Sequence, residues 1–195
     1  NQKIITKENS NLIHAENTET KEDFTIEKIS LKQNQSIQLI AVITHLCHYE
    51  KLKKFEEITT KFLKECGLGK DRSENNYSII EKIPSNEEKK FSTVIAEKLQ
   101  TKEIFSFSKG NPKILLNRCT RALINGKKVD ITPQLKRKFR KKIDKMNKQG
   151  QKAIAFAYKG LPKKKLEHYS EEFSENDLVF IGMIGSILGI IFGYY

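Results

Sequence analysis

The pattern of hydrophobic and polar positions predicts two helices in the first third of the chain. One spans 36–48, where apolar residues recur every three or four positions: Ile37, Ile40, Ile43, Leu46 and Cys47. The other spans 53–66, with a similar apolar stripe and the helix-stop signals Gly67 and Gly69 after it. Residues 1–23 are mostly polar, so we expect an extended segment with loops there.

Further along, the chain changes to short apolar runs that are typical of strands. Such runs occur in five places: 24–31, 77–83, 91–97, 103–108 and 153–158. The dipeptide Asn125-Gly126 stands between two apolar pairs and is a strong signal for a two-residue β-hairpin. The second half of the chain is therefore expected to form most of a sheet.

Two more helices are predicted around this hairpin. A short one begins at Pro112 and ends near residue 119, and a long one begins where Thr132 caps the chain before Pro133. The long helix has one apolar seam, ends at Gly150 and exposes its basic residues; the seam consists of Leu135, Phe139, Ile143 and Met146. The predicted fold class is α/β of the α+β type, with a mainly antiparallel, twisted sheet flanked by helices.

Composition favours an anionic partner and a reducing environment. The chain carries a formal net charge of +12, which suits nucleic acid, nucleotide phosphates or anionic lipid. Its three cysteines are widely spaced, which argues against a disulfide framework or a zinc site. His45 and His48 lie on one helix face without a third ligand, so no metal site is predicted.

The segment with the clearest chemistry is Lys109-Gly110-Asn111-Pro112, where a strand meets a helix start. A lysine at a strand end, beside a glycine that permits close approach, suits an anionic ligand. Lys89 precedes this motif in a polar turn, and Gly150-Gln151-Lys152 follows it. In that order the three segments resemble the nucleotide-binding (N) domain of P-type cation-transporting ATPases, in particular the calcium pumps.

The resemblance implies nucleotide-binding roles for residues that match the family's motifs. Lys109 and Gly110 match its Lys-Gly-x-Pro element. Lys89 matches the lysine of its Arg-Lys-x-Met-Ser-Val segment, and Lys152 takes the place of an arginine that contacts phosphate. Glu57 matches a glutamate that accepts a hydrogen bond from the adenine amino group.

Two departures from the family pattern predict weak ATP binding. The phenylalanine on which the family stacks adenine is missing after Pro84, and stacking of a base on an aromatic ring contributes about 1–3 kcal/mol. Glu88 also replaces the arginine before the lysine, which reverses a charge beside the expected pocket.

The resemblance also implies a function and partners. The domain would bind ATP (Mg-ATP in the full pump) and position it for phosphoryl transfer to an aspartate of a separate phosphorylation domain, with an actuator domain as a further partner. The family's phosphorylated-aspartate motif does not occur in this sequence, so no catalytic residue is assigned and no hydrolase activity of the chain alone is expected. The parent pump would be a membrane protein with this domain on its cytoplasmic face.

Two alternatives stay open, a basic nucleic-acid-binding module and a membrane-anchored one. The helix over 136–148 is the best nucleic-acid element, but no stacking aromatics interleave with its charges, so we expect no nucleic-acid partner. The uncharged run 178–195 meets the minimum length of a membrane span, although we favour a core strand followed by a tail. The expected organisation is an extended segment (1–23), the nucleotide-binding domain (24–185) and an apolar divergent tail (186–195).

Overall fold

The computed structural model describes the backbone in several stretches of the chain, which are 3–6, 12–16, 35–47, 57, 59–60, 63–64, 68, 76–150, 152–187 and 190–194. The helices are α2 (Gln35–Leu46), α5 (Pro112–Asn117), α6 (Pro133–Lys148) and α7 (Glu171–Ser174). The strands are β1 (Lys3–Thr6), β2 (Leu12–Glu16), β3 (Tyr77–Ile83), β4 (Phe91–Lys98), β5 (Ile104–Gly110), β6 (Cys119–Ile124), β7 (Lys127–Asp130), β8 (Lys152–Leu161), β9 (Leu178–Ile187) and β10 (Ile190–Tyr194).

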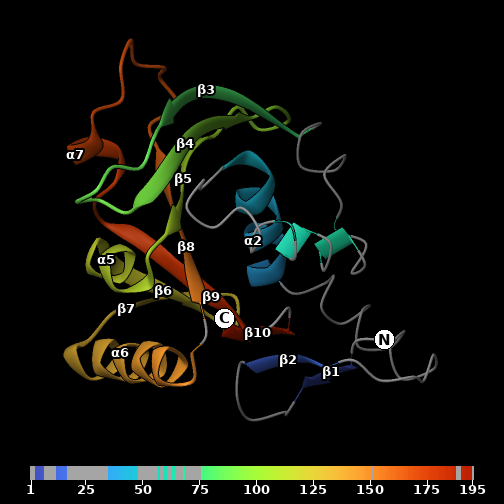
Figure 1. The fold of residues 1–195 in the computed structure, drawn as a ribbon. Helices are drawn as coiled ribbons and strands as arrows, with labels where there is room; N and C mark the ends of the chain where they lie inside the picture. Colours follow the sequence, from blue (N-terminus) through green and yellow to red (C-terminus); the bar gives the residue numbers. More distant parts are fainter. Residues whose placement is uncertain are drawn as a thin grey trace.

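The described strands form one twisted sheet with helices on both sides (Figure 1). Its order is β1-β2-β10-β9-β8-β5-β4-β3, and the β6–β7 hairpin joins it along β9. The described strand pairs are antiparallel apart from β6 and β9, which run parallel. The predicted fold class, a mainly antiparallel sheet flanked by helices, is confirmed.

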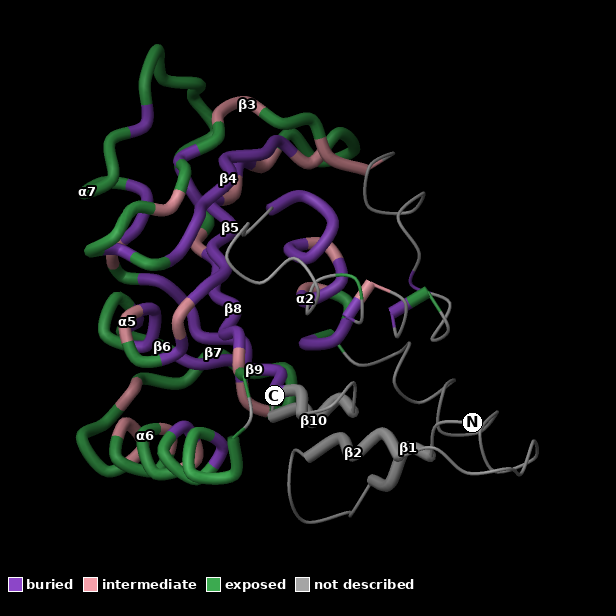
Figure 2. The backbone as a smooth tube through the Cα atoms, in the orientation of Figure 1, coloured by how far each residue is buried: buried purple, intermediate pink, exposed green. Residues whose placement is uncertain are grey.

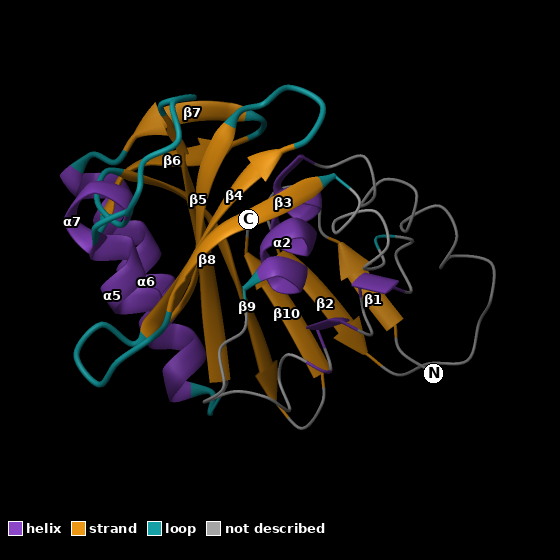
Figure 3. Ribbon diagram, turned by 90° about the horizontal axis from the view of Figure 1, so that it is seen from above, coloured by secondary structure: helices purple, strands orange, loops and turns teal. Residues whose placement is uncertain are grey.

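The central strands are buried on both faces, and each face has its own hydrophobic core. On one face α2 packs over Phe107, Phe156 and neighbouring side chains. On the other face α5 and α6 pack over a second cluster that includes Phe91 and Phe180. Figure 3 shows α2 on one side of the sheet and α5, α6 and α7 on the other. Figure 2 shows the consequence: β5, β8 and β9 are buried, whereas the outer surface of α6 is exposed.

Local sequence signals explain the boundaries of the hairpin. Asn125 and Gly126 adopt φ values of 49° and 75°, the left-handed pair that a type I′ turn requires. Glycine has no Cβ penalty in this region, and asparagine tolerates it better than most residues. The predicted β-hairpin is therefore confirmed.

Helix α6 begins and packs as its sequence predicts. The Thr132 hydroxyl accepts a hydrogen bond from the Leu135 backbone amide at 3.2 Å, and Pro133 occupies the first turn. Ile143 and Met146 are buried in the core, and Phe139 packs against the Phe180 ring at a centroid distance of 5.0 Å. The helix is thereby fixed to the sheet by one apolar seam, with its basic residues outward.

The ends of the chain join the sheet. Strands β1 and β2 pair with each other, and β2 pairs with β10. The apolar run considered as a membrane span forms β9 and β10, so part of the predicted tail is a sheet strand. No helix in the part of the chain that the structure describes is long and apolar enough to cross a membrane. The predicted strand over 24–31 lies outside the described residues, as does most of the predicted helix over 53–66.

Replacing Thr132 by alanine tests the cap of α6. The Leu135 amide would lose its acceptor, so we expect Thr132→Ala to lower the free energy of unfolding by about 1 kcal/mol. Urea denaturation followed by circular dichroism measures this loss. Gln134→Ala, an exposed substitution in the same turn, is the matched control and should change stability little. Equal losses in the two variants would contradict the capping role.

Candidate functional site

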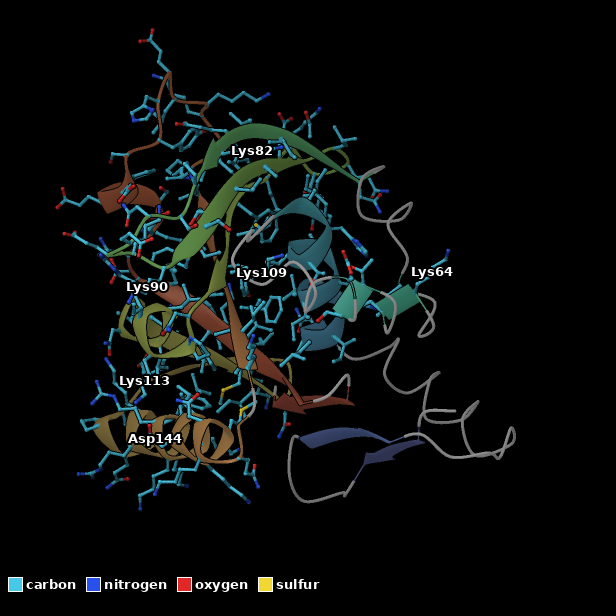
Figure 4. The ribbon with its side chains drawn as sticks, viewed as in Figure 1. Lys64, Lys82, Lys90, Lys109, Lys113 and Asp144 are labelled. Atoms are coloured by element: carbon cyan, nitrogen blue, oxygen red, sulfur yellow. The ribbon has the colours of Figure 1, made fainter. Side chains whose placement is uncertain are left out.

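Lys109 is a buried cation near the end of the central strand β5. The sheet register pairs it with Ser92 on β4 and with Phe156 on β8. Because directly paired residues share a face of an antiparallel sheet and Phe156 belongs to the α2 core, the Lys109 side chain lies on the α2 face. Its exposed fraction is 1%. Burial of an ammonium group is costly, which marks this position as a candidate for function (Figure 4).

Lys152 lies on the same face, one strand away. It is exposed at the start of β8, four residues before Phe156. Ile154, between the two, also belongs to the α2 core, so the alternation along β8 places Lys152 on the α2 face. Along β8, Lys152 is about 13 Å from Phe156, the residue that pairs with Lys109. Two lysines from neighbouring strands therefore face the same side of the sheet.

Glu57 lies beside α2, in a helical part of the chain that is described only at separate positions. Leu63 and Leu68 from this region belong to the α2 core, and His45 Nε2 is 3.1 Å from the Leu68 carbonyl oxygen. Glu57 itself is exposed. Figure 1 shows the helical residues around it next to α2. The helical residues of this region are thus on the same side of the sheet as Lys109 and Lys152.

Gly110 serves the packing of two strands. A Cβ at this position would collide with Phe91 and lie 2.5 Å from the carbonyl oxygen of Lys90. The next two residues of the motif also have local roles: the Asn111 side chain accepts a hydrogen bond from the Lys113 amide at 3.0 Å, and Pro112 opens α5. The glycine removes a clash with β4, so the ligand chemistry expected of this motif rests on Lys109.

Lys89 is held on the opposite face. Its Nζ is 2.8 Å from Glu175 Oε1 and 3.3 Å from Glu171 Oε1, and it lies 5.2 Å from the centroid of the Phe91 ring. The exposed fractions of the Lys89 and Glu175 side chains are 4% and 2%. Burial raises the pKa of Glu175, an effect that the hydrogen bonds from Lys89 and Thr93 oppose. The structure does not bring Lys89 together with Lys109 and Lys152.

Lys90 is a cation that the sequence motifs did not select. It is exposed and stands directly before β4, with φ at 49°. Its carbonyl oxygen accepts a hydrogen bond from the Asn111 amide at 2.9 Å, which places its backbone beside the Lys109 motif. Lys90 thus differs from Lys89 in that its side chain is exposed to solvent, whereas that of Lys89 is buried.

Comparison with known proteins decides the family. The sequence profile of the P-type ATPase cytoplasmic domain N matches residues 30–187, most of the chain. This chain belongs to that family. The resemblance expected from the motifs is thereby confirmed.

Curated relatives of this N domain include cation pumps of bacteria. A calcium-transporting ATPase of Bacillus subtilis is 27% identical over 182 residues, which cover 87% of this chain and 20% of that protein. Calcium-transporting ATPase 1 of Lactococcus lactis is 33% identical over 105 residues, 54% of this chain and 12% of that protein. A P-type magnesium-transporting ATPase of Salmonella typhimurium is 30% identical over 106 residues, 54% of this chain and 11% of that protein. The chain thus spans a fifth or less of the length of these relatives.

The contrast between Lys89 and Lys90 gives a prediction for this N domain. Lys89→Met would leave the Glu175 carboxylate buried without its cation, which costs about 3 kcal/mol of unfolding free energy near neutral pH. Lys90→Met, an exposed substitution, should change stability little. Urea denaturation of both variants measures the difference.

The pH dependence of the Lys89→Met deficit provides a second check. Without Lys89 the pKa of Glu175 rises further above its ordinary value, because only the carboxylate form needs the cation. A raised pKa in the folded state destabilises the fold above that pKa and stops doing so when the carboxyl is protonated. The deficit should therefore shrink as the pH falls through the raised pKa. A deficit that is the same at neutral and at acidic pH would contradict the assignment.

Proposed function

We propose that this N domain binds ATP on the α2 face of its sheet and positions it for phosphoryl transfer to an aspartate of a separate phosphorylation domain. The observation that carries the proposal is the shared face of Lys109 and Lys152, on neighbouring strands of a domain whose family is established. Two ammonium groups on one face suit the polyphosphate of a nucleotide, because each phosphate oxygen accepts charge-assisted hydrogen bonds.

Each residue in the proposed site has a distinct role. Lys109 supplies a fixed, buried charge on the sheet beneath the nucleotide. Lys152 supplies an exposed charge that reaches phosphate without the bidentate geometry of an arginine. Glu57, on the same side of the sheet, accepts a hydrogen bond from the adenine amino group. Lys90 takes the place proposed for Lys89 as the cation beside the β4–β5 end, because Lys89 is committed to Glu175.

The turn after Pro84 supplies no aromatic platform for adenine. The segment between Pro84 and Lys90 is a polar turn, in which Asn86 Oδ1 accepts a hydrogen bond from the Lys89 amide at 2.7 Å. A base without a stacking partner loses about 1–3 kcal/mol of binding free energy. We therefore expect a dissociation constant for ATP of roughly millimolar size.

The proposed partners follow from the family. We infer that the domain belongs to a longer cation-transporting pump in a membrane, where it faces the cytoplasm and works with phosphorylation and actuator domains. The substrate there would be Mg-ATP. Relatives named as calcium and magnesium transporters support cation transport as the overall function.

Titration of the chain with ATP, followed by amide NMR shifts, tests this proposal. We expect the shifts to concentrate at Lys109 and Lys152 on the α2 face and at Lys90 beside the β4–β5 end. Lys152→Ala should weaken binding by about tenfold, the loss expected for one charge-assisted hydrogen bond.

The matched control removes a lysine elsewhere. Lys163→Ala changes an exposed residue of the loop after β8 by the same charge, so it should leave ATP binding unchanged within about twofold. Equal weakening by both substitutions, or shifts confined to α5 and α6, would overturn the proposed site.

A further inference from the structure

A second candidate site lies on the other face of the sheet, between α6 and β9. Its apolar walls are formed by Leu135 and Phe139 of α6, Leu123 of β6, and Phe180 and Met183 of β9. Lys138 and Lys142 of α6 also line the pocket. We call this pocket the α6 cleft. Hydrophobic walls next to two ammonium groups form a site for a ligand that is both apolar and anionic.

The backbone of β9 also reaches the α6 cleft. Along one edge of β9, the described pairings with β6 end at Phe180, and those with β10 end at Met183. Ile181 and Gly182, between these two points, line the cleft. Backbone amide and carbonyl groups of β9 are thus next to the apolar walls, where an extended peptide could pair with them.

The charge of α6 is strongly one-sided. Asp144 is the one acidic residue of the helix, whereas eight are basic: Lys136, Arg137, Lys138, Arg140, Lys141, Lys142, Lys145 and Lys148. The Asp144 carboxylate is engaged by Lys113 of α5, with Nζ to Oδ1 at 2.8 Å. Figure 4 shows Lys113 and Asp144 next to each other on these two helices. The positive charge around the cleft is therefore mostly uncompensated within α6.

The two lysines that line the cleft interact electrostatically. Burial lowers the pKa of Lys142, and the charge of Lys138 lowers it further. An anion near both ammonium groups would favour their charged forms, so the cleft gains from a negatively charged ligand.

We propose that the α6 cleft binds an acidic segment of a partner protein, which places one large apolar side chain between α6 and β9 and its flanking carboxylates on Lys138 and Lys142. The apolar walls provide the pocket for the anchoring side chain. The basic helix attracts the acidic segment over long range and fixes its register along α6.

A protein segment fits these features better than a nucleic acid or a lipid surface. Nucleic acids bind through phosphates and stacked bases, but Phe139, the aromatic residue of α6, is half-buried against Phe180. A helix that inserts into a lipid surface needs an outward apolar face, whereas the apolar seam of α6 is buried at Ile143 and Met146. A peptide also brings backbone groups to Ile181 and Gly182 of β9, which line the cleft.

The proposal is independent of the ATP site. The α6 cleft is lined mainly by residues of the cluster under α5 and α6, with Leu123 and Ile181 shared with the α2 core. Lys109 and Lys152 lie on the face covered by α2 and do not line the cleft. Failure of one proposal therefore leaves the other standing.

Fluorescence polarisation tests the proposal with defined probes on the complete chain. The first probe is a short labelled peptide of glutamates and aspartates around one central phenylalanine. The second has alanine in place of that phenylalanine. We expect the first to bind about tenfold more tightly, because only it fills the apolar pocket.

Charge reversal locates the binding surface. Lys138→Glu combined with Lys142→Glu should weaken the phenylalanine peptide by at least about tenfold. Lys138→Glu alone, at an exposed position, tests the same surface if the double variant does not fold. The matched control is Lys163→Glu combined with Lys164→Glu, which makes the same charge change on the loop after β8 and should have little effect.

Three results would overturn the proposal. One is equal affinity for the two peptides, which would show attraction by charge alone. Another is equal weakening by the α6 and control variants. The third is tighter binding of a single-stranded oligonucleotide, or of vesicles containing phosphatidylserine, than of the phenylalanine peptide under the same salt conditions.

Discussion

The burial of β5, β8 and β9 on both faces is the constraint on which the rest of the structure depends. Side chains of β8 and β9 point alternately into two hydrophobic cores, one under α2 and one under α5 and α6. Strand β5 contributes Phe107 to the first of these and Ile104 to a third cluster. The face of the sheet on which a residue lies therefore decides which ligand it can serve. Lys109 and Lys89 are both deeply buried cations, yet the sheet separates them.

The two lysines before β4 show how a local turn distributes these roles. Asn86 holds the turn through the amides of Glu88 and Lys89, and Glu175 draws the Lys89 ammonium group into the α7 side of the domain. The next residue, Lys90, adopts a left-handed backbone conformation and is exposed. A buried ion pair gives little net stability, but it specifies one arrangement of the turn, and here that arrangement decides which lysine faces solvent.

Much of this fold was predictable because local physics determines it. The Asn125-Gly126 turn, the Thr132 cap and the seam of α6 each depend on residues close in sequence. The site was less predictable. Glu175 lies far from Lys89 along the chain, and no local pattern indicates their contact. Gly110 is a similar case, because the reason for a glycine there is Phe91 of the neighbouring strand, which would collide with a Cβ. Motif spacing identified the region, whereas tertiary contacts assigned the individual side chains.

The separation of the two faces also bears on how such a domain combines two ligands. A nucleotide at Lys109 and Lys152 would contact β5 and β8 on one face, and an acidic segment at the α6 cleft would contact β9 on the other, so neither blocks the other. The strands between them are close-packed on both sides, and packed cores transmit displacements because they compress little. Any energetic coupling between the two sites would therefore act through the pairing of β8, which carries Lys152, with β9, which lines the cleft. This pairing has a register shift at Phe156/Ala157 of β8.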